Sequence, residues 1–475
     1  MRRRPNVLLV VLDALRRDAI EPHGAPPGST PAIAELARRG TAVPHAYATS
    51  SWTLPSHASL FAGRLPRQLG LGQAPDGSPQ GARGVIEGLG ERLLPSVLRA
   101  AGYETRGFSA NLWASPHVGL DTGFDEFVYA MPDRGGRIEA MLSGGPRAGV
   151  AWALEGLRAR SDNGAAQLGD ALRGAIDEWS GRPTFWFANV CECHSPCLPP
   201  RPWNDLLAVD RVRAAIEARK HLSFQALCLS AAGRATVPAE ALGRMRHLYA
   251  RAAAYLDRWL ADVLAALDRR GILDQTLVIV TADHGENFGE HGLVGHGFAV
   301  NEALINVPLV IAGPGAPSSD GALSLASLPR IVAEAAGIEE HPWPSEELPA
   351  GVAVSQYDAI GSPDHPRVIE FARRWDLDDE AVARLTASYT AVTDGRRKLV
   401  RRNEDELRLY DLERDPDERA PLDPHGVGGD FDDLVAALEH PALAIGSAAP
   451  PAAAAAPSAE ELEALQQQMR LLGYG

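Results

Sequence analysis

The sequence predicts an α/β protein built on a doubly wound, mostly parallel sheet flanked by helices, with a small C-terminal α+β subdomain. Near-continuous apolar runs, typical of parallel strands buried on both faces, occur at residues 6–12, 185–190 and 277–281. Segments with helical periodicity lie between and beside them, at residues 94–101, 167–179 and 239–270. Strands that alternate with helices indicate a sheet covered on both faces.

Length and local composition divide the chain. The 475 residues, 45% of them hydrophobic, can form one large domain and a smaller one. We expect an α/β catalytic domain over residues 1–345 and a small antiparallel-sheet subdomain over 350–440, with a hairpin turning at Asp394-Gly395. An Ala- and Pro-rich linker follows at 444–457, and a capping-box pattern predicts a C-terminal helix at 458–475.

Polar residues follow each of the three apolar runs. Asp13 follows the first, His194 lies just beyond the second, and Asp283 and His284 follow the third. Ligands bind beyond the carboxyl ends of the strands in open parallel sheets, so these distant segments are expected to meet. Carboxylates with an imidazole form a set typical of a divalent metal site.

The segment Thr53-Leu54-Pro55-Ser56-His57 places a hydroxyl at the start of a predicted helix, because Pro55 suits a first helical turn. The free amides of that turn favour an anionic group. A threonine hydroxyl is a poor nucleophile at neutral pH, and a divalent cation is the usual means of lowering its pKa.

Each of these features also has a purely structural interpretation. Asp13 and Thr53 could be helix caps, and residues 283–285 could form a polar turn. Together they are much less easily explained as coincidence. A further alternative is a structural zinc site made by His194 with Cys191, Cys193 and Cys197, although this spacing lacks two separated C-x-x-C pairs.

The order of the motifs resembles that of the sulfatases, within the alkaline phosphatase superfamily, nearly from end to end. The motifs that carry the resemblance are Pro5-Asn6-Val7, the Thr53 segment, Thr281 to Glu286, Gly289 to Gly297, and Leu409 to Glu418. Sulfatases carry Cys or Ser in a C-x-P-S-R segment and convert it to formylglycine. Here Thr53 replaces the cysteine and His57 the arginine, and threonine cannot form that aldehyde. A threonine nucleophile is similar to that of nucleotide pyrophosphatase/phosphodiesterases and lipoteichoic acid synthases.

The resemblance also bears on the number of metal ions. Two-zinc relatives use an additional D-x-x-x-H pair that this sequence lacks, and Leu12 stands where the family has a second aspartate. We therefore expect one divalent ion held by Asp13, Thr53, Asp283 and His284. Manganese or zinc suits this ligand set best, and calcium or magnesium also fits it.

The remaining site residues are candidates for proton transfer and for substrate binding. His194 or His296 is expected to contact a nonbridging oxygen or to protonate the leaving group. Asn111 and His57 are expected to bind substrate. His291, in the same glycine-flanked loop as His296, is left open.

Three functions follow from the sequence. The first is a metal-dependent hydrolase or transferase that cleaves phosphate mono- or diesters or phosphonate esters through Thr53. The second is a sulfuric ester hydrolase, and the third is a noncatalytic binding protein with the same fold.

The composition of the chain limits its possible partners and its expected cellular location. The net charge of −15 disfavours nucleic acid, so we expect a small-molecule, glycan or lipid substrate with an anionic ester. No apolar run approaches the roughly 20 residues of a membrane span. Without such a run or a signal peptide, we expect a cytoplasmic location. An apolar stripe on the C-terminal helix suggests packing on the main domain or on a second subunit.

Overall fold

The computed structural model describes residues 4–73, 79–130, 145–160, 162–317, 321–343, 351–423 and 431–440, together with Leu443. The predicted linker at 444–457 and the predicted helix at 458–475 lie outside these residues.

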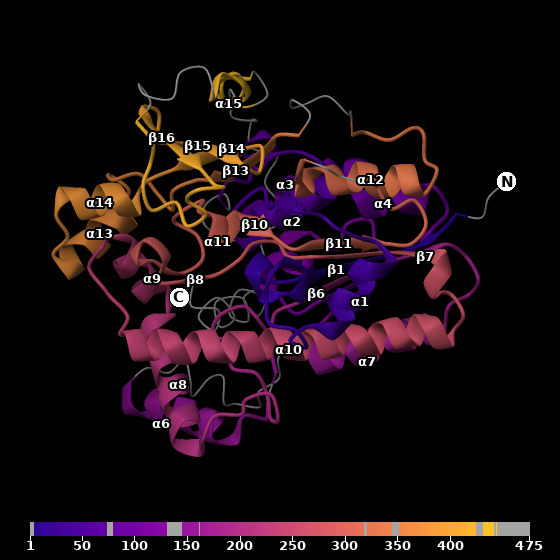
Figure 1. Ribbon diagram of the computed structural model, residues 1–475, viewed down its shortest axis with the longest axis horizontal. Coiled ribbons are helices and arrows are strands. Elements are labelled where there is room, and N and C mark those ends of the chain that lie inside the picture. Colours follow the sequence, from indigo (N-terminus) through magenta and orange to yellow (C-terminus); the bar gives the residue numbers. More distant parts are fainter. Residues whose placement is uncertain are drawn as a thin grey trace.

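A seven-stranded sheet forms the centre of the protein (Figure 1). In spatial order its strands are β2 (Thr41–Ala42), β11 (Leu309–Ala312), β7 (Thr276–Thr281), β1 (Asn6–Leu12), β6 (Thr184–Val190), β4 (Glu104–Ser109) and β5 (Glu126–Tyr129). β1 pairs in parallel with β7 and β6, whereas β11 is antiparallel to both of its neighbours. Every residue of β1, β6 and β7 is buried, which explains why these strands are apolar at nearly every position.

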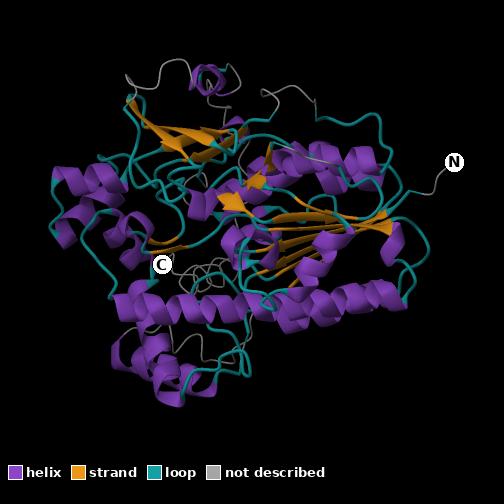
Figure 2. Cartoon of the chain, viewed as in Figure 1, coloured by secondary structure: helices purple, strands orange, loops and turns teal. Residues whose placement is uncertain are grey.

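Helices cover both faces of this sheet (Figures 1 and 2). One face carries α1 (Pro31–Arg39), α7 (Ala165–Asp177) and the long α10 (Ala239–Arg269). The other carries α2 (Thr53–Ala62), α4 (Leu94–Ala100) and α12 (Leu328–Ala335). The predicted doubly wound, mostly parallel architecture is therefore confirmed.

A four-stranded antiparallel sheet follows near the C-terminus, as the sequence predicted. Its strands are β13 (Ala353–Tyr357), β14 (Tyr389–Thr393), β15 (Arg397–Arg402) and β16 (Glu406–Asp411). The turn between β14 and β15 contains Asp394 and Gly395, and Gly395 has a φ of 91°, which favours glycine. α15 (Asp432–Leu438) packs on this sheet.

Two helical segments outside the sheets contact one another. The first contains α8 (Ala208–His221) and α9 (Phe224–Ala231), and α6 (Gly145–Arg158) packs against α8. The second, between β13 and β14, contains α13 (Pro366–Trp375) and α14 (Asp379–Leu385), and α14 contacts α9. Across the part of the chain that the structure describes, no helix has both the length and the apolarity of a membrane span.

Candidate active site

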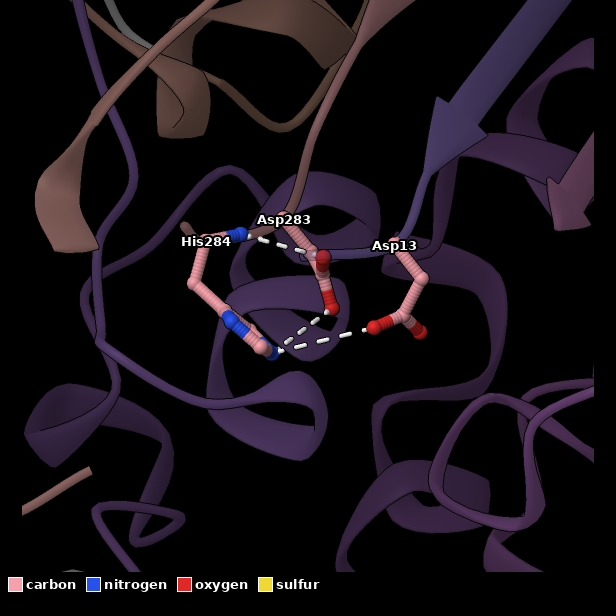
Figure 3. Close-up of side chains that lie close together, drawn as sticks. All are labelled: Asp13, Asp283 and His284. Carbon is pink, nitrogen blue, oxygen red and sulfur yellow. Dashed lines mark hydrogen bonds and ion pairs between the residues drawn. The ribbon is translucent and has the colours of Figure 1, made fainter. Parts of the chain in front are cut away.

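Asp13, Asp283 and His284 meet where β1 and β7 end (Figure 3). One potential ligand atom from each residue lies within 4.8 Å of the others, and all three side chains are fully buried. His284 Nε2 is 3.9 Å from Asp13 Oδ1 and 3.5 Å from Asp283 Oδ2. The parallel register of β1 and β7 brings these residues together, as expected from their positions after the strands.

The hydrogen bond of His284 fixes which ring nitrogen faces the other two residues. Its Nδ1 lies 2.8 Å from the carbonyl oxygen of Gly285, so we assign the ring proton to Nδ1. The lone pair of Nε2 then points toward Asp13 and Asp283. A backbone acceptor that holds a histidine in this tautomer is typical of a metal ligand.

The carboxylates of Asp13 and Asp283 each have a buried oxygen atom without a hydrogen bond. Asp13 Oδ1 and Asp283 Oδ2 are buried and accept no hydrogen bond from any described residue. Burial also raises the pKa of Asp283, because the charged form is poorly solvated there. A divalent ion would satisfy both oxygens and compensate their charge, so Asp13, Asp283 and His284 fit a metal site.

Thr53 is the first residue of α2, and its side chain faces this group. Thr53 Oγ1 lies 3.3 Å from His284 Nε2 and 3.4 Å from Asn111 Nδ2. Every residue of α2 is buried, because the helix lies between the sheet and α12. The hydroxyl is therefore held beside the three candidate ligands, and the role of Thr53 as a fourth metal ligand stays a prediction.

Asn111 connects Thr53 with Asp13. Its Nδ2 donates a 2.7 Å hydrogen bond to Asp13 Oδ2, and its Oδ1 accepts a 2.8 Å hydrogen bond from the amide of Trp113. The second bond fixes the orientation of the side-chain amide. Asn111 thus orients Asp13 and leaves its N–H group close to the Thr53 hydroxyl.

His57, which we expected to bind substrate, lies among protein groups. Its Nδ1 is 3.0 Å from the carbonyl oxygen of Thr53 and 3.4 Å from Asp283 Oδ2, and its Nε2 is 3.2 Å from Asn189 Nδ2. Both ring nitrogens face protein groups, and the side chain is fully buried. One helical turn separates residues 53 and 57, so both lie on the same face of α2. His57 lies next to Asp283. The geometry gives His57 a positioning role instead of the predicted contact with substrate.

His194 and His296 lie beside the group, with their rings near that of His284. The His296 ring centroid is 4.5 Å from that of His284 and 4.6 Å from that of His194. Burial lowers the pKa of His296 to about 3. Burial would also lower the pKa of His194, but the carboxylates of Asp13 and Glu286 outweigh it and raise that pKa above its ordinary value. Nearby carboxylates therefore outweigh burial at His194, whereas burial dominates at His296.

The sequence analysis did not identify two residues of this site, Glu286 and Asn189. Glu286 is fully buried, with Oε2 3.2 Å from His296 Nδ1, and burial raises its pKa to about 7. Asn189 donates from Nδ2 to Asp13 Oδ2 at 3.3 Å, besides its contact with His57. The available signals were an amide inside an apolar strand and a glutamate three residues after Asp283.

The cysteines do not form the alternative zinc site. All three are buried and carry free thiols; Cys191 Sγ approaches Asp13 Oδ2 at 3.7 Å, whereas Cys197 Sγ donates to the carbonyl of Cys193. Within the described ranges, the only group of three or more potential ligands at metal-binding separation is that of Asp13, Asp283 and His284. His291 is exposed at a positive φ of 51°.

Comparisons with known proteins identify similar sequences and similar folds. A choline-sulfatase of Rhizobium meliloti is 26% identical over 455 residues, covering 87% of this chain and 81% of the relative. A solved 2-O GAG sulfatase superposes with a TM-score of 0.61 at 19% identity, covering 93% of this chain and 91% of that one. The phosphonate monoester hydrolase of Agrobacterium radiobacter superposes with a TM-score of 0.59 at 20% identity, covering 98% and 96%.

The family model named Sulfatase matches residues 5–338, which span the central sheet, Thr53 and all three candidate metal ligands. Members of this family bind a divalent metal, for which the buried Asp-Asp-His group is suited. The chain therefore belongs to the sulfatase family of hydrolases.

Proposed function

We propose that this protein is a metal-dependent hydrolase or phosphotransferase that cleaves phosphate or phosphonate esters through Thr53. One observation carries the proposal. The side chain that faces the candidate metal ligands from the start of α2 is a threonine, with Oγ1 3.3 Å from His284 Nε2. A threonine cannot supply the formylglycine aldehyde of a sulfatase, whereas its hydroxyl can attack phosphorus directly.

The surrounding side chains suit this reaction. A divalent ion bound by Asp13, Asp283 and His284 would lower the pKa of the Thr53 hydroxyl and offset negative charge on the phosphoryl group. Asn111 is placed to donate a hydrogen bond to a nonbridging oxygen from Nδ2, which already lies 3.4 Å from Thr53 Oγ1.

Proton transfer is assigned to His194. As Thr53 Oγ1 bonds to phosphorus, its hydroxyl proton passes to solvent, the bond to the leaving-group oxygen breaks, and His194 supplies the proton that this oxygen requires. Water or an acceptor alcohol then attacks phosphorus and gives its proton to His194, while the bond from phosphorus to Thr53 Oγ1 breaks and Oγ1 regains a proton from solvent. Glu286, beside His296, contributes a carboxylate that helps to hold the pKa of His194 above its ordinary value.

A sulfatase activity is the second candidate, favoured by the family and by the relatives that carry that name. The phosphonate monoester hydrolase with the same fold shows that this architecture also accommodates phosphorus esters. The nucleophile, and not the fold, must therefore decide between the two.

Matched nitrophenyl esters of phosphate, phosphonate and sulfate separate these candidates. We expect the full chain, loaded with manganese or zinc, to turn over a phosphorus ester. We expect Thr53→Val, which keeps the shape but lacks the hydroxyl, to lose about 100-fold or more in kcat. Acid-quenched wild type should carry a phosphoryl group on Thr53 by mass spectrometry.

The matched control is Thr53→Ser, which keeps a hydroxyl and should retain more activity than Thr53→Val. Metal binding by Thr53→Val, measured by calorimetry, verifies that the site is intact. Full turnover by Thr53→Val would refute the nucleophile. Sulfate turnover with no phosphorus-ester turnover would support the second candidate instead.

A further inference from the structure

An aromatic cavity of about 310 Å³ adjoins the candidate active site. Six aromatic side chains contribute to its lining: Trp52, Trp113, Phe224, Phe298, Tyr357 and Phe371. Its volume is at the lower end of the roughly 300–1,000 Å³ of ligand pockets, so it suits a compact group of one or two rings. Aromatic faces in such a cavity favour a flat apolar occupant.

The cavity is connected to the nucleophile by neighbouring residues. His296 lines it directly. Trp52 precedes Thr53, and its ring meets that of Trp113 edge to face at 5.6 Å. The amide of Gly297 donates to the carbonyl of Ser51 at 2.9 Å, which ties the loop after His296 to the start of α2. A substrate whose ester lies at Thr53 can therefore place its leaving group in this cavity.

Part of the cavity wall comes from the two helical segments outside the central sheet. α9 contributes Leu227 and Cys228, and α13 contributes Val368 and Phe371. Figure 1 shows α9, α13 and α14 gathered on the same side of the protein, where α9 contacts α14. These helices supply none of the candidate metal ligands, so their side chains can set specificity without altering the chemistry.

The charges of the lining residues further limit the class of ligand that the cavity can bind. None of the described residues that line the cavity is an aspartate or a glutamate, whereas the solvent-exposed Arg367 is one of them. A quaternary ammonium would meet aromatic faces but also the positive charge of Arg367. Trp52 Nε1 is buried and donates to no described residue, so an acceptor atom on the occupant could satisfy it.

We infer that this cavity binds the leaving group of the substrate and selects an aromatic alcohol that is neutral or anionic. The assignment of that group as the leaving group of a phosphorus ester rests on the proposed function. Binding of the free alcohol in the cavity does not, since it requires neither Thr53 nor turnover.

The first test measures binding of naphthol to the full chain by calorimetry, with choline and glucose as comparison ligands. We expect naphthol to bind and the other two not to bind. Val368→Trp, which fills the cavity, should weaken naphthol binding about ten-fold or more, and Phe371→Ala should weaken it several-fold by removing an aromatic wall. Ile369→Ala is the matched control, because Ile369 lies on the same helix but is 53% exposed.

The second test compares kcat/KM for naphthyl phosphate and methyl phosphate. We expect wild type to prefer the naphthyl ester beyond the difference in their chemical reactivity. Val368→Trp should lower that preference about ten-fold, whereas Ile369→Ala should leave it unchanged.

The outcomes separate the two proposals. Naphthol binding that Thr53→Val retains and Val368→Trp loses supports the cavity, even if no phosphorus ester is turned over. Equal naphthol binding by wild type, Val368→Trp and Phe371→Ala, with all three folded by circular dichroism, would overturn the inference. Binding of choline in preference to naphthol would overturn the predicted chemistry of the leaving group.

Discussion

Lys398 offers a sharp test of how the C-terminal sheet is held against the active-site domain. Its side chain is fully buried in β15, and Nζ lies 2.6 Å from the carbonyl of Val300, 3.0 Å from Glu302 Oε1 and 2.8 Å from Glu418 Oε1. Burial alone would lower the pKa of Lys398, but Glu418 and Glu302 outweigh it and raise that pKa. Because Val300 follows Phe298 and His296, this ammonium also anchors a loop of the site and its cavity.

Lys398→Met removes the ammonium and leaves two carboxylates close together in the interior. Breaking a buried ion pair from one side costs about 3–5 kcal/mol. Glu302 Oε2 retains hydrogen bonds from the Tyr47 hydroxyl at 3.1 Å and from Asn306 Nδ2 at 2.8 Å, so Glu302 stays partly compensated. We therefore expect a loss near the lower limit, about 3 kcal/mol in the free energy of unfolding.

Urea denaturation followed by tryptophan fluorescence measures this loss. The control is Arg258→Met, which breaks an exposed pair with Asp262 and should change stability by no more than about 0.5 kcal/mol. Replacing Lys398, Glu302 and Glu418 together by Met, Gln and Gln should recover much of the loss, because no uncompensated charge remains. A loss below about 1 kcal/mol for Lys398→Met alone would refute the reasoning.

Three further predictions concern acid stability, helix capping and the metal. Burial would raise the pKa of Glu290, but Arg16 lowers it from 4.5 to about 2, so the pair adds stability above pH 4.5 that is lost as pH falls toward 2. Glu290→Gln should therefore weaken the dependence of the unfolding free energy on pH in that window. The Asp257 carboxylate accepts hydrogen bonds from two amides at the start of α1, so Asp257→Ala should lower the unfolding free energy by about 1–2 kcal/mol, measured in urea. Added manganese or zinc should raise the melting temperature of wild type, and Asp283→Asn should abolish most of that shift.

The fold and the cluster of candidate metal ligands could be predicted because burial constrains the sequence strongly. A strand covered on both faces must be apolar along its length, so β1, β6 and β7 could be recognised in the sequence as buried strands. The polar residues at their carboxyl ends then had only one edge of the sheet at which to meet, which brought Asp13, Asp283 and His284 together. Thr53 was recognisable because a helix start leaves its amides free for an anion.

Contacts between distant segments explain what the sequence did not reveal. Asn189 reaches Asp13 and His57 from another strand, and no local pattern specifies which side chain its amide will meet. The aromatic cavity is even harder to predict from the sequence, because its walls come from α9, α13, α14 and several loops. Each aromatic residue there has an ordinary packing explanation in the sequence, and only the three-dimensional arrangement leaves a space between them.

The hydrogen bonds of His57 explain why an imidazole suits this threonine-based site. Asn189 Oδ1 lies 3.3 Å from the Ser109 hydroxyl, so its Nδ2 faces Asp13 and His57, and His57 Nε2 must accept a hydrogen bond. The proton on His57 Nδ1 then lies beside the carbonyl of Thr53. Arginine at this position would instead bring a permanent charge close to Asp283 Oδ2, now 3.4 Å from His57, and would compete with a cation for that oxygen.

His57→Arg should therefore weaken manganese binding about ten-fold or more in calorimetry, with His57→Gln as the neutral control. Unchanged manganese affinity in a folded His57→Arg protein would contradict this role, because the charge of Asp283 would then not be what holds the metal beside Thr53.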